Sequence, residues 1–256
     1  MRRSLCRRLS NSIPACEDIC RLDKGPIVYE RLHFELESHV KDICQQLVAT
    51  TTDELSFLGV LLRQWNLFID QLQSIRQIFL YLDRTYVLHT PGLAPIFDLG
   101  LSFFRNIIAT RPDVQRPLTG GLLQLILQER RGEAVDRQTI KDLVAMMTTL
   151  QTYDQFEVQL LSATGDFYKE LAQRSIVELD GSAYIALCEQ RLREEADRVN
   201  LCLNPSSRVQ LLRVVEERLI SQNAVALLEK SFESLMVRIS LSCLLLTACA
   251  GRHAHV

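Results

Sequence analysis

Residues 57–86 read FLGVLLRQWNLFIDQLQSIRQIFLYLDRTY, and this stretch decides the fold class. Its apolar residues recur at steps of three or four, the spacing that places side chains on one face of an α-helix. The residues on this face are Phe57, Leu61, Trp65, Phe68, Leu72, Ile75, Phe79, Leu82 and Tyr86. The pattern predicts one helix that runs until Pro91. At about 1.5 Å per residue it would be roughly 45 Å long, a length typical of helical rods.

The first half of this helix is also apolar away from its main face. The additional apolar residues are Leu58, Val60, Leu62, Leu67 and Ile69. A helix that is apolar on nearly every side must be covered on more than one side. Either neighbouring helices of the same chain or a partner protein provide this cover, and the sequence leaves both alternatives open.

The same periodicity recurs in both directions along the chain. It predicts further helices around residues 29–47, 96–107, 119–127, 136–150, 156–171, 180–199, 212–219 and 225–235. In the helix around 180–199 the expected apolar face is Tyr184, Cys188, Leu192, Ala196 and Val199, and in the last helix it is Val225, Leu228, Phe232 and Leu235. Three of these are expected to begin at the capping residues Thr119, Asp136 and Asp180. Since no run of alternating polar and apolar residues is present, the sequence predicts an all-α fold. The expected architecture is an elongated, solenoid-like array of antiparallel helical bundles.

Composition narrows the range of functions. A net charge of −2 gives no basic excess for binding nucleic acid or an anionic membrane. None of the eight cysteines forms a C-x-x-C pair, so buried free thiols are expected rather than a zinc or disulfide framework. No glycine-rich phosphate loop or metal-ligand spacing is present, and no cofactor is expected.

The acidic residues near the end of the chain offer little for catalysis. Glu194 and Glu195 are predicted to lie on a solvated helix face, with i,i+4 pairs between Glu189 and Arg193 and between Glu194 and Arg198. General acid chemistry needs a buried carboxyl group with a shifted pKa. The sequence therefore predicts a protein without catalytic residues.

The two ends differ in character from the middle. Residues 1–14 form a basic leader whose composition overlaps with that of an organellar transit peptide. Leu241–Ala250 is an apolar run, but a helix that crosses a bilayer needs about 20 apolar residues. We therefore expect this run to lie outside a membrane.

Three motifs in a fixed order carry a family resemblance. They are IRQIFLYLDRTYV at 75–87, ERRGEAVDR at 129–137 and RLREEADR at 191–198. Together they resemble the amino-terminal region of cullins, from about Ala15 to Met236. The tract LDRTYVLHTPGLAPIFDLGLSFFR at 82–105 resembles the cullin-4 subfamily in particular.

The resemblance implies a stalk of five-helix cullin repeats that serves as a non-catalytic scaffold arm of a cullin-RING ubiquitin ligase. It divides the chain into five parts: a leader (1–14), a truncated first repeat (15–92), a second repeat (93–222), the start of a third repeat (223–236) and an unmatched tail (237–256). It also implies a location in the cytoplasm and nucleus.

In this family the first repeat docks an adaptor protein through its second and fifth helices. For cullin-4 the adaptor is of the damaged-DNA-binding protein 1 type, a propeller protein that presents substrate receptors. ACEDIC at 15–20 resembles the tail of the second helix, and 57–86 resembles the fifth. The resemblance therefore implies an adaptor interface at Ile19, Cys20, Leu58, Leu62, Asn66 and Ile69.

Departures from the family pattern lead to two expectations. Most of the second helix is replaced by the leader, so adaptor affinity is expected to fall roughly 30- to 1,000-fold for each lost anchor residue. The RING-binding half is not matched, so neither RING binding nor ubiquitin ligation is expected. The alternatives are a helical-rod subunit of a vesicle-tethering complex and a tail-anchored helical protein.

Overall fold

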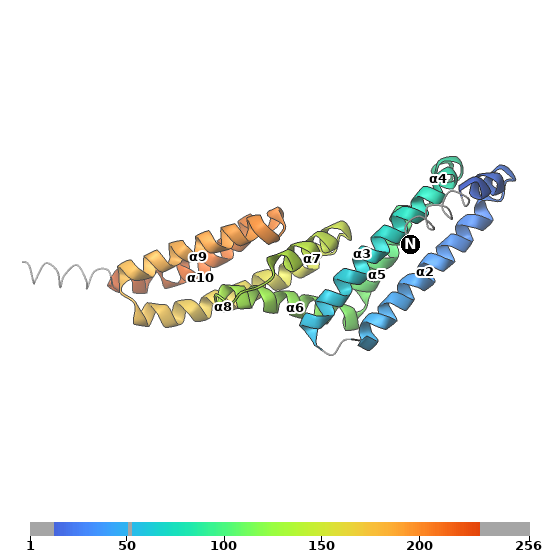
Figure 1. Cartoon of the computed structure of the whole chain (residues 1–256). Helices are drawn as coiled ribbons and strands as arrows, with labels where there is room; N and C mark the ends of the chain where they lie inside the picture. The colour runs from blue at the N-terminus through green and yellow to red at the C-terminus, as the bar shows by residue number, and fades with distance from the viewer. Residues whose placement is uncertain (1–12, 51–52, 231–256) are drawn as a thin grey trace, which may run out of the picture. The chain divides into compact units, whose positions relative to one another are not determined.

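The computed structural model describes residues 13–50 and 53–230, and every secondary-structure element in these ranges is helical (Figure 1). This confirms the all-α prediction for the described part of the chain. A helical segment at residues 13–21 comes first, and another at 224–230 comes last. Between them lie α2 (Gly25–Thr50), α3 (Glu54–Ile78), α4 (Leu80–Thr85), η1 (Val87–His89), α5 (Ile96–Thr110), α6 (Pro112–Arg130), α7 (Arg137–Thr149), α8 (Tyr153–Glu178), α9 (Gly181–Cys202), η2 (Pro205–Ser207), α10 (Arg208–Leu219) and η3 (Ser221–Asn223).

The chain divides into two compact units, the first ending at Phe156 and the second beginning at Glu157. In unit 1, α3 packs against α5, α6 and α7, and α2 packs against α5. The predicted apolar face of α3 forms the centre of this core, since Phe57, Leu61, Trp65, Phe68 and Leu72 are all buried. The Trp65 and Phe104 rings meet edge to face with centroids 5.1 Å apart, a favourable geometry for aromatic pairs.

Two adjacent glycines allow α6 to approach α3 closely. A methyl group at Gly121 would lie 3.0 Å from the carbonyl oxygen of Glu54 and 3.0 Å from the Leu58 side chain. A methyl group at Gly120 would meet the Glu54 carboxylate at 2.6 Å. Leu58 is thus covered by α6 of the same chain. For this side chain, a neighbouring helix and not a partner protein provides the cover.

The prediction of one helix over residues 57–86 is wrong, because α3 ends at Ile78 and α4 begins at Leu80. Phe79 between them has a ψ angle of 18°, away from the helical value. The backbone bonds on both sides persist: the Phe79 N–H donates to Ile75 and the Asp83 N–H donates to Phe79, each at 3.0 Å. Beyond the break, Leu82 and Asp83 are buried. Since no proline or glycine marks this position, periodicity did not reveal the break.

The predicted helix starts are confirmed at two of three positions. Asp136 accepts the Gln138 N–H at 3.0 Å, and Asp180 accepts the Ala183 N–H at 2.7 Å, both as N-caps. The prediction for Thr119 is wrong, because α6 already begins at Pro112 and Thr119 is buried within it. Proline suits the first helical position, where its missing N–H has no acceptor in any case.

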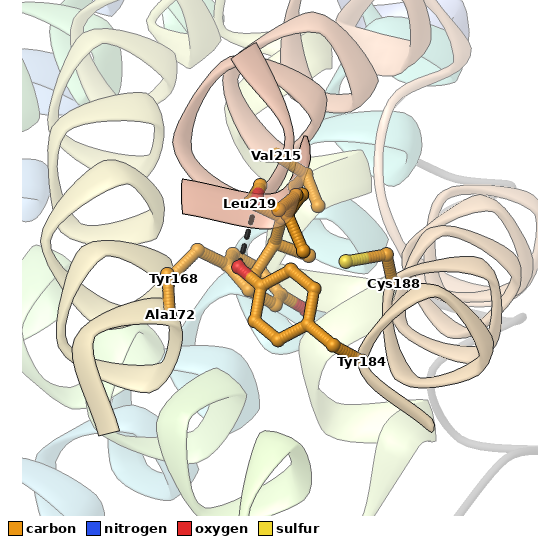
Figure 2. Packing of buried hydrophobic residues seen from close by; sticks show 7 residues of the cluster. Tyr168, Ala172, Tyr184, Cys188, Val215 and Leu219 are labelled. Atoms are coloured by element: carbon orange, nitrogen blue, oxygen red, sulfur yellow. Dashed lines mark hydrogen bonds between the residues drawn. The ribbon is translucent and has the colours of Figure 1, made fainter. Parts of the chain in front are cut away.

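Unit 2 is built from the carboxy-terminal part of α8 together with α9 and α10. Its buried cluster contains Tyr168 and Ala172 of α8, Tyr184 and Cys188 of α9, and Val215 and Leu219 of α10 (Figure 2). The Tyr184 hydroxyl donates to the Leu219 carbonyl at 2.7 Å and so joins α9 to the end of α10. Burial of Tyr184, Cys188 and Val199 confirms the predicted apolar face of α9.

The prediction that Glu195 is solvated is wrong. Its side chain is fully buried, accepts the Tyr168 hydroxyl at 2.6 Å and pairs with the buried guanidinium of Arg198. Arg198 therefore pairs with Glu195 and not with Glu194, which instead contacts Arg191 at 2.7 Å. These i,i+3 pairs replace the expected i,i+4 pair because Glu195 faces α8. The exposed pair between Arg193 and Glu189 is confirmed at 3.1 Å.

The described cysteines are free thiols, as predicted. Cys16, Cys44, Cys188 and Cys202 are buried and Cys20 is half-buried. In residues 13–50 and 53–230, no helix is both long enough and apolar enough to span a membrane. The basic leader up to residue 12 and the apolar run Leu241–Ala250 lie outside the described residues.

Candidate interaction surface

The six predicted interface residues differ widely in exposure. In the helical segment 13–21, Ile19 is 42% exposed and Cys20 is half-buried. On α3, Leu58 is only 1% exposed, whereas Asn66 is exposed and Leu62 and Ile69 are half-buried. Leu58 packs on α6, so no partner reaches it while unit 1 is folded.

The helical segment 13–21 meets α4 rather than the middle of α3. Cys16 is buried with a backbone hydrogen bond at Leu82, and Cys20 lines a pocket together with Tyr81. Tyr81 follows Ile69 by twelve residues and lies on α4, beyond the break at Phe79. The predicted residues of α3 are therefore separated from Ile19 and Cys20, and the structure does not bring the two groups together.

The pocket beside Cys20, here called the α4 pocket, has a volume of about 490 Å³. Its lining includes Cys20, Gly25, Pro26, Tyr81, Thr85 and Tyr86. Sequence reasoning missed Tyr81 and Thr85 because they lie beside the periodic apolar line. Their position within the IRQIFLYLDRTYV motif at 75–87 was the only signal that pointed to them.

Tyr86 forms a rigid wall of the α4 pocket. A methyl group at Gly25, the first residue of α2, would lie 3.1 Å from the Tyr86 ring, so only glycine allows this approach without a shift. The Tyr29 ring packs against Tyr86 edge to face at 6.4 Å, and the Tyr29 hydroxyl donates to the Ala94 carbonyl at 2.9 Å. These contacts bind the start of α2 to the segment after α4.

The turn between the helical segment 13–21 and α2 contains Asp23 in the left-handed region, with φ at 57°. Aspartate adopts this conformation more readily than most residues. The turn brings Cys20 and Gly25 to the same pocket and so completes its wall.

Burial, with a smaller contribution from the neighbouring Cys20, raises the pKa of the Cys16 thiol to about 12. Cys16 is therefore a neutral thiol at physiological pH and acts as a small apolar side chain between its helix and α4. A thiol with such a raised pKa is a poor nucleophile. Its role here is packing.

The outer side of the helical segment 13–21 combines apolar and charged groups. Ile19 is exposed, and Leu22 is 71% exposed. Arg21 lies 3.8 Å from Glu17 and 3.7 Å from Asp18, in exposed pairs that contribute little to stability. Exposed apolar side chains beside a pocket and within a charged rim are typical of protein-binding surfaces. Among the described residues, no group of His, Cys, Asp or Glu side chains is arranged to hold a metal ion.

Comparison with known proteins agrees with the arrangement of the helices. Residues 7–247 match the family model described as the cullin alpha solenoid domain, which bears out the expected array of helical bundles. Cullin-4A of Mus musculus is 36% identical over 234 residues, which cover 91% of this chain and 31% of the relative. Cullin-4A of Homo sapiens is 35% identical with the same coverage, and cullin-4 of Dictyostelium discoideum is 32% identical over 82% of this chain and 26% of its own length. The chain thus spans about a third of the length of the curated relatives that it matches.

Proposed function

This chain belongs to the cullin family, and on that premise we propose that it acts as an amino-terminal scaffold arm in a cullin-RING ubiquitin ligase. In this role it binds a substrate-receptor adaptor and catalyses no step itself. Its similarity to cullin-4 proteins favours an adaptor of the damaged-DNA-binding protein 1 type. The same similarity favours a role in ubiquitin-dependent degradation, in the cytoplasm and nucleus, over vesicle tethering.

One observation carries this proposal: the α4 pocket joins the two parts of the chain that resemble the adaptor-binding helices. Cys20 comes from the tail of the second helix on the family mapping, while Tyr81 and Thr85 come from the stretch that maps to the fifth. Both contribute to one surface, and Ile19 and Leu22 add exposed apolar area beside it.

We therefore centre the adaptor contact on Ile19, Cys20, Tyr81 and Thr85. An aromatic side chain at a pocket wall is the kind of residue that contributes most to protein–protein affinity. Leu62, Asn66 and Ile69 retain exposed or partly exposed surface on α3 and form a second, outlying part of the proposed contact. Leu58 is removed from the contact because it is buried in unit 1.

The test measures the affinity of the purified adaptor for the chain by isothermal titration calorimetry. Tyr81→Ala is expected to weaken binding by about tenfold or more, equivalent to about 1.4 kcal/mol. The matched control is Phe34→Ala, which removes an aromatic ring that is 60% exposed on α2. Circular dichroism melting curves of both variants show whether unit 1 remains folded. Equal affinities of the parent, Tyr81→Ala and Phe34→Ala proteins would place the contact elsewhere.

The non-catalytic role has its own test. Ubiquitin chain formation is reconstituted with this polypeptide as the only cullin, next to a full-length cullin as the positive control. We expect no chains above the background without a cullin. Chain formation at the rate of the full-length control would contradict the scaffold-arm role.

A further inference from the structure

The carboxy-terminal end of α8 presents backbone carbonyl groups to a lysine from far along the chain. The last carbonyl groups of any helix lack partners within the helix. At the end of α8, the Lys230 ammonium donates to the carbonyl oxygens of Leu179 at 2.9 Å and Val177 at 3.4 Å, and also to that of Ile176. An ammonium group has three N–H donors, so three carbonyl acceptors match its full donor capacity.

The helical segment 224–230 meets the rest of unit 2 through the same face that bears Lys230. Leu227, one turn before Lys230, is buried in the cluster that contains Tyr184 and Leu219. Val225 and Leu228 are each 71% exposed. The sequence pattern placed Val225 and Leu228 on the apolar face of this helix, and that prediction is wrong because Leu227 and Lys230 form the docked face. Phe232 and Leu235, which continue the predicted pattern, lie outside the described residues.

We propose that Lys230 is a charge-dependent latch that holds the helical segment 224–230 on the end of α8. A positive charge is stabilised at a helix carboxy terminus by the partial negative charge of the carbonyl groups there. The apolar contact of Leu227 is not directional, so it does not by itself fix the orientation of the segment. Three hydrogen bonds to separate carbonyl groups restrict rotation of the segment about its axis. The latch thereby determines that Val225 and Leu228 face outward.

The latch depends on the shape of the ammonium as well as on its charge. A compact ammonium reaches three carbonyl groups that surround one point, whereas the planar guanidinium of arginine directs its donors within one plane. Lys230→Arg therefore keeps the charge but loses part of the hydrogen bonding. Lys230→Met keeps a flexible, unbranched side chain and loses both the charge and the donors.

Hydrogen–deuterium exchange of the full chain, read by mass spectrometry, tests the latch. Lys230→Met is expected to speed amide exchange in the peptide that covers 224–230 by about tenfold or more, with Lys230→Arg intermediate. Peptides from α6 in unit 1 serve as the internal control and are expected to exchange as in the parent. Exchange at 224–230 within about twofold of the parent in Lys230→Met would overturn the proposal.

Chemical rescue separates the ammonium from a general packing effect. In Lys230→Ala, propylammonium chloride supplies a short apolar stem and an ammonium, and it is expected to slow exchange at 224–230. Sodium chloride at the same ionic strength is the matched control and is expected to have no such effect. If the two salts act equally, the three carbonyl groups do not form an ammonium-specific cradle, and the latch is refuted.

Discussion

Asp83 on α4 caps α5, a helix that begins thirteen residues later. The backbone N–H of Ile96, the first residue of α5, donates to the Asp83 carboxylate at 3.1 Å in a buried hydrogen bond. Pro95 sits at the N-cap position of α5, and its side chain has no oxygen to accept a bond. Burial raises the pKa of Asp83; the nearby Asp98 raises it further, while the Ile96 bond and Arg76 lower it.

Asp83→Ala is expected to destabilise unit 1 by about 1–2 kcal/mol at neutral pH, because it removes the capping acceptor. Asp83→Asn retains a carbonyl oxygen and removes a buried charge, so its unfolding free energy is expected to equal or exceed that of the parent. Urea unfolding curves measure both values. A loss in Asp83→Asn as large as that in Asp83→Ala would show that the charge itself is needed.

The raised pKa of Asp83 also sets the sign of a pH effect. The folded chain holds the Asp83 proton more tightly than the unfolded chain, so the unfolding free energy falls as pH rises from the ordinary aspartate pKa to the raised folded value. Above the pKa of Asp83 in the folded chain, the unfolding free energy does not fall further on account of this group. In Asp83→Asn, the slope of unfolding free energy against pH is expected to be less negative across this acidic range. Parallel curves for the parent and the variant would contradict the raised pKa.

Gly120 and Gly121 form a matched pair on α6. Gly121→Ala is expected to destabilise unit 1 by about 1–3 kcal/mol, because the added methyl group presses on the Glu54 backbone and on buried Leu58. Gly120→Ala meets only the flexible end of the Glu54 side chain, so the helix propensity of alanine is expected to leave it neutral or up to about 1 kcal/mol more stable. Thermal unfolding compares the two. The reverse order of stabilities would mean that α3 and α6 do not approach as described.

The buried network of Tyr168, Glu195 and Arg198 is expected to be sensitive to the loss of either charge alone. Glu195→Ala leaves the Arg198 guanidinium buried without this carboxylate and is expected to cost about 3–5 kcal/mol. Tyr168→Phe removes one hydrogen bond to a charged acceptor and is expected to cost about 1.5–3 kcal/mol. The double variant Glu195→Leu with Arg198→Met is expected to be more stable than Glu195→Ala, since no buried charge remains. Chemical unfolding of unit 2, followed by a probe placed on α9, measures these differences.

Tyr184 makes unit 2 sensitive to alkaline pH. Burial, with a smaller contribution from Cys188, raises the pKa of Tyr184 to about 12 from an ordinary value of 10.0. Between these two pH values the unfolded chain has lost the tyrosine proton while the folded chain retains it, so the unfolding free energy falls as pH rises. The loss attributable to Tyr184 is on the order of 2 kcal/mol. Urea unfolding at the two ends of this window is expected to show a smaller decline in Tyr184→Phe than in the parent. Equal declines would contradict the assignment.

The periodic apolar residues predicted the helices well because burial follows one face of each helix. The α3 stripe and the α9 stripe both form cores, and Asp136 and Asp180 cap the helices at which they were expected to act. Helix starts can be predicted from local sequence, since an N-cap side chain accepts a hydrogen bond from a backbone N–H only two or three residues later.

Contacts between distant residues were harder to predict. The break at Phe79 accompanies a bond between Asp83 and Ile96 that periodicity does not register. Glu195 was expected in solvent because its charged neighbours are exposed, but Tyr168 on another helix supplies its partner. The candidate interface was expected in the middle of α3, but the contact between the helical segment 13–21 and α4 is also a contact between distant residues, so we now centre it on α4. Leu227 likewise replaced Leu228 as the buried residue of its helix.

The long interval between α8 and Lys230 has a consequence for synthesis on the ribosome. Ile176 precedes Lys230 by 54 residues, so the end of α8 emerges well before its capping ammonium exists. At roughly 5–20 residues per second, the nascent helix waits about 3–11 s for that cap. During this interval the carbonyl groups at residues 176–179 are satisfied by water, and the apolar side chains of α8 await α9 and α10. The carboxy-terminal end of α8 therefore gains its lysine cap only after α9 and α10 have been synthesised and translation has passed residue 230.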